Sequence, residues 1–180
     1  MPTHTLAITW EQFHRDARNL ALKLHENKLA FSHILAITKG GLIPAMIIGR
    51  ELGINDIRTI GVRSYGIGSL EEETKRGGVV ITSEPSQADL AGFPLVVDDL
   101  IDSGSTINAV NTKIRDLTFD RTPRPYVVYA VIYGKGRYPK MPNFFYGVDH
   151  HPDAWLLMPW DMAPQFQLPL TCKLDKIKNG

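Results

Sequence analysis

Three carboxylates and a turn of glycine and hydroxyl residues stand together in the segment Leu95–Thr106, LVVDDLIDSGST. Asp98 and Asp99 end an apolar run, and Asp102 follows just before the residues SGST. Like charges this close disfavour each other's ionised form, which points to a ligand that compensates for the repulsion. Adjacent carboxylates can accept hydrogen bonds from vicinal hydroxyl groups or hold a hydrated Mg²⁺.

The second half of this segment is suited to a phosphate. It precedes a predicted helix, where free backbone N–H groups and the helix dipole attract anions. Gly104 lets the backbone approach a ligand closely, and Ser103, Ser105 and Thr106 offer hydroxyl donors. A sugar phosphate such as a ribose 5-phosphate could use both halves of the segment. The plainer alternative is a polar strand end followed by an ordinary N-cap.

Hydrophobic periodicity predicts strands and helices that alternate along the chain. The predicted helices are residues 9–24, 44–52 and 105–117, and the predicted strands are 33–38, 57–65, 94–99 and 124–135. Thr9 with Gln12 fits a capping box, and Trp10 and Phe13 are expected in the core. Alternation of this kind predicts an α/β fold with a central, mainly parallel sheet flanked by helices. Ligands of such sheets bind beyond the carboxyl ends of the strands, where the loop TKGG at 38–41 would also lie.

Length and composition limit the function classes. The 180 residues predict one domain, 1–180, and a net charge of +1 argues against nucleic acid as a partner. A single cysteine, Cys172, allows no internal disulfide and fits a reducing compartment. The first twenty residues lack the pattern of a secretory signal, and no apolar run reaches membrane-spanning length. We therefore expect a cytoplasmic protein with no integral membrane segment.

Three motifs carry a resemblance to a known family. The string VVDDLIDSGST resembles the phosphoribosyl pyrophosphate (PRPP) signature of the type I phosphoribosyltransferases. The string AITKGGLIPAMIIGRELG resembles their pyrophosphate-binding loop and the helix after it. DAWLLMPWDM resembles the purine-binding tail of the subgroup that uses xanthine and guanine, and the resemblance extends from Ile8 to Asp161.

The resemblance implies transfer of a 5-phosphoribosyl group from PRPP to a 6-oxopurine (guanine, xanthine or hypoxanthine), with release of pyrophosphate. The alternatives are a phosphoribosyltransferase for another base and a regulatory protein that senses PRPP. Mg²⁺ is the implied cofactor, and we expect a homo-oligomer, either a dimer or a tetramer. A reactive ribosyl cation must be shielded from water, so a lid is expected at about 64–92, pinned by a short strand at 78–82. A small C-terminal cap that binds the purine is expected at about 136–170.

The resemblance also implies roles for the matched residues of the PRPP site. Asp98 and Asp99 would hold the ribose hydroxyls directly or through Mg²⁺, and Asp102 would handle the proton on purine N7. Ser103, Gly104, Ser105 and Thr106 would cradle the 5-phosphate. Lys39 and Gly40 would bind pyrophosphate, often through a strained or cis peptide bond in this family. Lys39 stands where the subgroup usually has arginine, which keeps the charge but loses the bidentate fork.

The resemblance implies roles for four more residues, three at the base and one at a metal ion. Lys135 would donate to purine O6, although a lysine after a strand can also be a surface residue. Trp155 would stack on the base, although it could be an ordinary core residue, and the Leu156 backbone would contact the exocyclic edge. Asp161 would reach a second Mg²⁺, directly or through water.

Overall fold

The structure, a computed structural model, describes residues 4–64, 78–136 and 143–161. Its helices are α1 (Trp10–Glu26), α2 (Leu42–Leu52) and α3 (Ser105–Leu117), with a short 3₁₀ helix η1 at Ala88–Leu90. Its strands are β1 (His4–Ala7), β2 (His33–Thr38), β3 (Ile57–Ser64), β4 (Val79–Ser83), β5 (Pro94–Ile101), β6 (Val128–Gly134), β7 (Phe144–Asp149) and β8 (Ala154–Leu157). None of the helices in these described ranges is long and apolar enough to cross a membrane.

Six strands form the central sheet, in the order β4-β3-β2-β5-β6-β7. All neighbours are parallel except β4, which runs antiparallel to β3, so the predicted α/β fold with a mainly parallel sheet is confirmed. The chain moves outward from β2 to β4, then returns to β5 beside β2 and moves outward again to β7. The strand order therefore reverses between β2 and β5, which is where open α/β sheets form a crevice for ligands.

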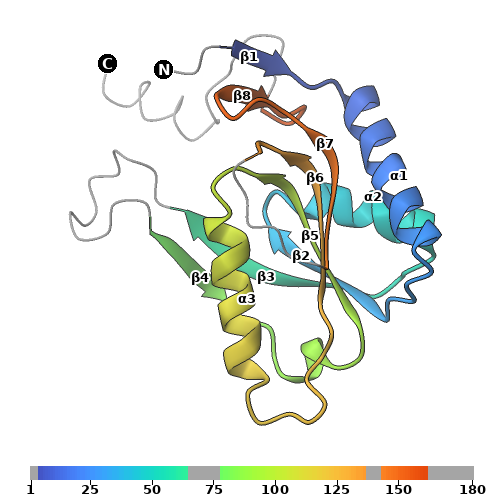
Figure 1. Cartoon of the computed structure of the whole chain (residues 1–180), viewed down its shortest axis with the longest axis vertical. Helices are drawn as coiled ribbons and strands as arrows, with labels where there is room; N and C mark the ends of the chain where they lie inside the picture. Colours follow the sequence, from blue (N-terminus) through green and yellow to red (C-terminus); the bar gives the residue numbers. More distant parts are fainter. Residues whose placement is uncertain (1–3, 65–77, 137–142, 162–180) are drawn as a thin grey trace, which may run out of the picture.

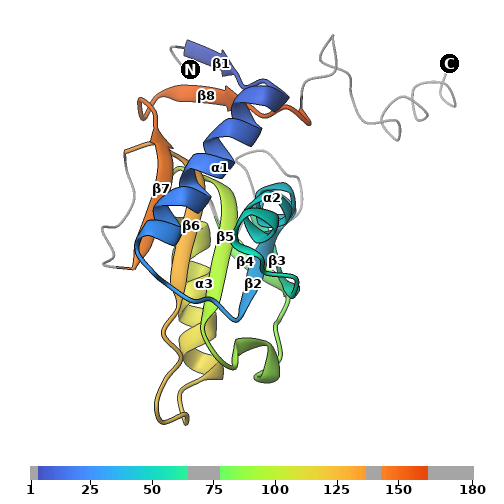
Figure 2. The same cartoon turned by 90° about the vertical axis from the view of Figure 1, so that its right-hand side faces the viewer.

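Helices cover both faces of this sheet, with α1 and α2 on one face and α3 on the other (Figures 1 and 2). Strand side chains alternate between the two layers, as the period of two requires. In β2, Ile34 and Ala36 pack in the cluster that includes α1 and α2, whereas Leu35 and Ile37 pack in the cluster that includes α3. Both strand faces are thus buried, which explains the continuous apolar runs in the sequence.

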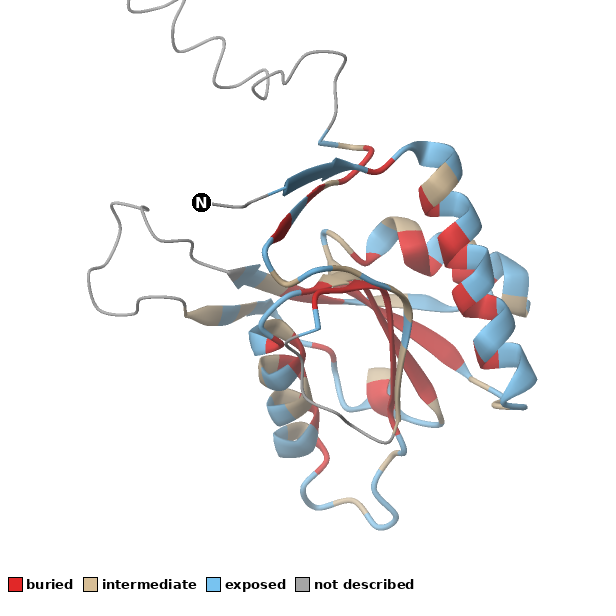
Figure 3. Cartoon of the chain, turned by 45° about the horizontal axis from the view of Figure 1, so that its top comes forward, coloured by how far each residue is buried: buried red, intermediate tan, exposed pale blue. Residues whose placement is uncertain are grey.

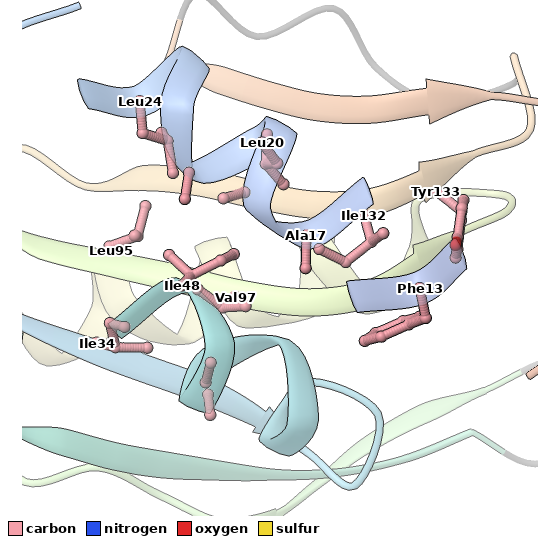
Figure 4. Packing of buried hydrophobic residues seen from close by; sticks show 14 of the residues in the cluster. Phe13, Ala17, Leu20, Leu24, Ile34, Ile48, Leu95, Val97, Ile132 and Tyr133 are labelled. Atoms are coloured by element: carbon pink, nitrogen blue, oxygen red, sulfur yellow. The ribbon is translucent and has the colours of Figure 1, made fainter. Parts of the chain in front are cut away.

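Helix α1 follows its predicted pattern along its length but not at its first residue. The Thr9 hydroxyl accepts the Gln12 N–H at 3.1 Å, and Phe13, Leu20 and Leu24 are buried against the sheet (Figure 4). The prediction that Trp10 lies in the core is wrong, because 54% of its surface is exposed. Its ring instead lies 6.0 Å from the ring of the half-buried Trp160.

Most element boundaries agree closely with the predicted ones, but β6 begins at Val128, four residues after the predicted start at 124, and β5 ends later than predicted. Strand β2 and helix α3 have the predicted limits, and α2 ends at Gly53, whose φ of 71° is left-handed. Strand β5 continues two residues beyond its predicted end, because Leu100 and Ile101 remain paired with β6. Asp98 and Asp99 therefore lie within strand β5 and not in a loop. Pairing of the strand with its neighbours fixes their backbones.

A small two-stranded parallel sheet of β1 and β8 lies over one end of the central sheet (Figure 1). Sequence periodicity did not predict β1. The short strand predicted at 78–82 is confirmed as β4. After β4, the fully buried side chain of Leu90 in η1 anchors the chain to the core. The rest of the expected lid, 65–77, and parts of the expected cap, 137–142 and 162–170, lie outside the described residues.

Candidate active site

A cavity of about 490 Å³ lies at the carboxyl ends of the central strands, beneath β8. Its wall comes from the loop after β2, the end of β5, the start of α3, the residue after β6, and β8 with the residues that follow it. Ten of the predicted site residues line it: Lys39, Gly40, Asp98, Asp99, Asp102, Thr106, Lys135, Trp155, Leu156 and Asp161. The fold thus brings together residues that are up to 122 positions apart in the sequence (161 minus 39).

Asp98, which is buried, and Asp99, which is half-buried, form an acidic pair at the end of β5. Asp98 is 6% exposed, and its carboxylate accepts the Asp99 N–H at 3.0 Å. Burial raises the pKa of both carboxyls; the neighbouring charge of Asp99 raises that of Asp98 further, and Asp161 adds to the rise at Asp99. Within the described ranges neither carboxylate has a cationic partner. The pair is therefore an unneutralised site that would favour a bound cation.

The TKGG loop rests directly on this pair. A Cβ atom added to Gly40 would lie 2.3 Å from Asp99 Oδ1, so only glycine fits without displacing the carboxylate. A Cβ on Gly41 would lie 2.2 Å from the carbonyl oxygen of Val97. The peptide bond between Thr38 and Lys39 is cis, and the exposed Lys39 lies at the cavity wall. Both glycines are thus explained by close approach of the loop to β5.

Lys135 and Asp102 meet at 3.1 Å between Nζ and Oδ2. Lys135 is only 5% exposed, and its backbone N–H donates to the Ile101 carbonyl oxygen, which fixes it beside β5. The interpretation of Lys135 as a surface lysine is therefore wrong. The carboxylate of Asp102 is 57% exposed, so the pair presents one buried cation and one accessible anion.

Trp155 lies over this pair, with Lys135 Nζ 5.8 Å from the ring centroid. Its side chain is 54% exposed, which excludes the core interpretation. The next residue, Leu156, is 6% exposed and packs in the core cluster beside α1 and α2. The alternation of β8 thus leaves the indole available to a ligand and anchors the strand through its neighbour.

The residues predicted to bind the 5-phosphate lie at the start of α3. Gly104 has a left-handed φ of 80°, a conformation that glycine adopts readily. The hydroxyls of Ser103 and Ser105 lie 2.9 Å apart, and Thr106 lines the cavity. Ser103, Gly104 and Ser105 do not line the cavity, although they lie between the lining residues Asp102 and Thr106 in the chain. The N–H groups of the first helical turn are available there to an anion.

Comparison with known proteins shows the family of this chain. Residues 9–167 match the family described as "Phosphoribosyl transferase domain". The chain belongs to the phosphoribosyl transferase family. It is 41% identical over 172 residues to a xanthine-guanine phosphoribosyltransferase of Gluconobacter oxydans (strain 621H), with 93% of this chain and 90% of the relative covered.

Two further relatives support the same assignment. A xanthine-guanine phosphoribosyltransferase of Ruegeria sp. (strain TM1040) is 38% identical over 169 residues, covering 90% of this chain and 88% of the relative. Among solved structures, a purine phosphoribosyltransferase from Pyrococcus horikoshii superposes with a TM-score of 0.67 at 26% identity. It covers 91% of this chain and 99% of the other.

Sequence reasoning missed several residues that line the cavity of this phosphoribosyl transferase. Met158 and Trp160 stand in the same DAWLLMPWDM string that was used for its neighbours, so that string already held their signal. Val62 of β3 also lines the cavity, and no sequence pattern marks it. Trp160 packs edge-on against Phe13 at 5.1 Å, which ties the segment after β8 to the start of α1.

The metal prediction for this phosphoribosyl transferase concerns Asp98, Asp99 and Asp161. In the described part of the chain, no three His, Cys, Asp or Glu side chains are close enough to hold a metal ion by themselves. All three aspartates nevertheless line one cavity, and the buried Asp98 and half-buried Asp99 have no cationic partner among the described residues. The residues therefore fit a divalent cation that takes its remaining oxygen ligands from a bound substrate.

Proposed function

We propose that this protein transfers the 5-phosphoribosyl group of PRPP to a 6-oxopurine (guanine, xanthine or hypoxanthine) in purine salvage, and that the reaction requires Mg²⁺. The observation that carries the choice of base is the Lys135–Asp102 pair beneath Trp155. An ammonium can only donate, and an ionised carboxylate can only accept. The pair therefore complements a base edge that places an acceptor beside an N–H donor, as O6 and N7 of a 6-oxopurine do.

Base selection follows from the burial of Lys135. A buried ammonium loses its water, so a base that fails to offer an acceptor leaves it unpaired. Adenine presents an amino group at the matching position and would be rejected. Asp102 is exposed enough to reach an entering base, and it would stabilise the proton on N7 or remove it as the new bond forms.

The other end of the cavity suits the leaving group and the sugar. Breaking the bond between C1 and pyrophosphate develops positive charge on the ribose and negative charge on the oxygen that leaves. Lys39 and the backbone at Gly40 would bind pyrophosphate, while Asp98 and Asp99 would hold the ribose hydroxyls. Residues 103–106 would bind the 5-phosphate. Mg²⁺, when bound with PRPP, would neutralise the leaving charge, and Asp98, Asp99 and Asp161 are the side chains that would hold it.

Stacking on Trp155 would hold the base and cover the reacting carbon from water. The indole is already exposed at the mouth of the cavity, and the ordered strand β8 fixes its position. We also infer that the enzyme works in the cytoplasm. We further infer that it is a dimer or tetramer, and gel filtration and light scattering of the purified chain would test this oligomeric state.

The decisive experiment is an assay of nucleotide formation from PRPP and Mg²⁺ with guanine, xanthine, hypoxanthine, adenine and uracil. We expect turnover with one or more of the three 6-oxopurines and little with the other two bases. Omitting Mg²⁺, with a chelator present, should abolish turnover. Turnover of adenine or uracil above that of every 6-oxopurine would refute the assigned base class. Tight PRPP binding without any turnover would instead support the regulatory alternative.

A further inference from the structure

A second cavity, of about 470 Å³, lies between α1 and α2. It is almost as large as the active-site cavity, and the two share no lining residue. Its α2 wall is Glu51 and Leu52, at the opposite end of the helix from the Lys39–Gly40 loop. The proposed reaction uses none of the residues in this second cavity, so their arrangement needs an explanation of its own.

The α1 wall of this cavity is basic. His14, Arg18, Leu22 and His25 recur at helical spacing and form one stripe, with Arg15 beside it. Figure 3 shows that the outward surface of α1 is exposed along its length. Glu51 is the one acidic residue that lines the cavity among the described parts of the chain. The lining therefore offers two permanent cations and two histidines against one carboxylate.

Both arginines have guanidinium N–H groups that are not used in hydrogen bonds among the described residues. Arg15 approaches Asp16 through its Nε atom at 3.5 Å, and Arg18 approaches Glu51 through its Nε atom at 3.2 Å. Neither guanidinium donates a hydrogen bond within residues 4–64, 78–136 and 143–161. Their terminal NH₂ groups are thus available, and paired guanidinium groups are suited to the bidentate recognition of phosphate.

The remaining lining defines the rest of the ligand. Leu22, 55% exposed, and Leu52 provide an apolar surface beside the arginines. Glu51 can accept hydrogen bonds from hydroxyl or amino groups, and a purely anionic ligand would leave it facing like charge. The volume is in the range of sites for small organic molecules and exceeds what a single phosphate ion fills.

We propose that the groove between α1 and α2 is a second ligand site that binds a phosphorylated small molecule with an apolar ring and hydroxyl groups, the chemistry of a nucleotide. The phosphates lie on Arg15 and Arg18, the ring lies on Leu22 and Leu52, and hydroxyl groups donate to Glu51. This inference is independent of which base the active site uses.

Calorimetric titration with ATP tests the site, with saturating PRPP and Mg²⁺ present to fill the active site. The variants are R15Q/R18Q and, as a control, R50Q, which makes the same kind of substitution once at an exposed position of α2 outside the cavity and removes one positive charge. We expect the dissociation constant for ATP to rise about tenfold or more in R15Q/R18Q and to stay within about twofold in R50Q. Inorganic phosphate should bind at least about tenfold more weakly than ATP, because it leaves the apolar surface uncovered.

A third variant covers the case in which R15Q/R18Q fails to fold. Leu22→Glu places a carboxylate on the cavity surface and leaves both arginines intact, so it must also weaken ATP binding. Absence of ATP binding to the PRPP-saturated enzyme would overturn the proposal, as would equal affinity in wild type, R15Q/R18Q and Leu22→Glu. A change of sedimentation in R15Q/R18Q without a change in ATP binding would also overturn it and make the groove a subunit interface.

Discussion

At the amino end of β2 the buried side chain of His33 has a partner for each ring nitrogen. At the carboxyl end of β5, by contrast, the buried Asp98 and half-buried Asp99 have no cationic partner among the described residues. His33 Nε2–H donates to the Asp89 carbonyl oxygen at 2.7 Å, and Nδ1 lies 2.9 Å from the Ser32 hydroxyl. The carbonyl can only accept, which fixes the tautomer and makes Ser32 the donor.

The difference separates stability from function along the same sheet. Satisfied polar groups at the amino end hold η1 and the segment after β4 against the central strands. Unsatisfied charges at the carboxyl end cost stability in the free protein, and binding of the proposed Mg²⁺ and PRPP would offset that cost. Substitutions at the amino end should therefore destabilise the fold without changing turnover, whereas neutralising the acidic pair at the carboxyl end should impair the reaction and stabilise the free protein.

The largest effect is expected when the acidic pair is neutralised. Asp98→Asn together with Asp99→Asn should weaken binding of PRPP with Mg²⁺ by about 10²- to 10³-fold, from loss of two charge-assisted contacts. Binding of the purine should change far less. Titration of PRPP and, separately, of guanine measures both affinities, and an unchanged PRPP affinity would mean that the pair is only a polar strand end.

The same double variant should also remove a pH dependence of stability that the acidic pair causes in the absence of ligands. Burial raises the folded-state pKa of Asp98 above its unfolded value, so stability is complete at low pH and is lost as pH rises through the folded pKa. Removing both charges should raise the melting temperature at pH 7 to 8 and flatten this dependence. Thermal unfolding of both proteins across pH, without Mg²⁺ or PRPP, provides the comparison.

Asp102→Asn should give the next largest effect. Removing a group that transfers or stabilises a proton should lower kcat by about 10²-fold or more, with PRPP affinity nearly unchanged. Single-turnover kinetics would separate the chemical step from product release. Wild-type turnover in this variant would exclude Asp102 from the mechanism.

Lys135→Ala should reduce kcat/KM for guanine and xanthine by about 10- to 100-fold, since a charged hydrogen bond in a desolvated site is worth about 1.5–3 kcal/mol. Any trace of adenine activity should fall less. Lys113→Ala is the matched control, because Lys113 pairs with Glu84 on the surface at 2.6 Å, away from the cavity. An equal fall for every base would assign Lys135 a structural role.

The smallest effect on activity is expected from substitution of His33, at the amino end of β2. His33→Ala should lower the free energy of unfolding by about 1–3 kcal/mol, because it leaves the Asp89 carbonyl oxygen without its donor, and kcat should stay within about twofold. Denaturant unfolding and steady-state kinetics measure the two quantities. His4→Ala, at an exposed position, should change neither, and a large loss of turnover in His33→Ala would show that the two ends of the sheet are coupled.

His33 also gives wild-type stability a pH dependence at the acid side. Burial and then the positive charge of Arg58 lower the pKa of His33 below 6.5. The unfolded state therefore takes up the proton first, and stability falls as pH drops below 6.5. His33→Ala should remove this part of the acid-side slope in thermal unfolding curves. A slope that persists unchanged would assign it to other groups.

The sequence by itself determined the local elements and most members of the candidate site. Alternating and helical periodicities are local properties, so β2, α3 and the end of α2 at Gly53 could be predicted from neighbouring residues. Both the acidic residues and the predicted phosphate-binding residues likewise stand within the twelve-residue segment LVVDDLIDSGST, so they could be recognised together. Pattern reasoning failed at β1, whose four residues are all exposed and carry no buried face to signal a strand.

Only the tertiary structure decided how these residues meet. Strand order placed β2 beside β5, so that Gly40 touches Asp99, and pairing of β5 with β6 extended β5 to Ile101. The burial of Lys135 and the exposure of Trp10 and Trp155 depend on which elements cover them. The physical reason is that burial, ion pairing and pKa are set by groups distant in the chain, whereas periodicity reports only that a residue faces one side of its own helix or strand.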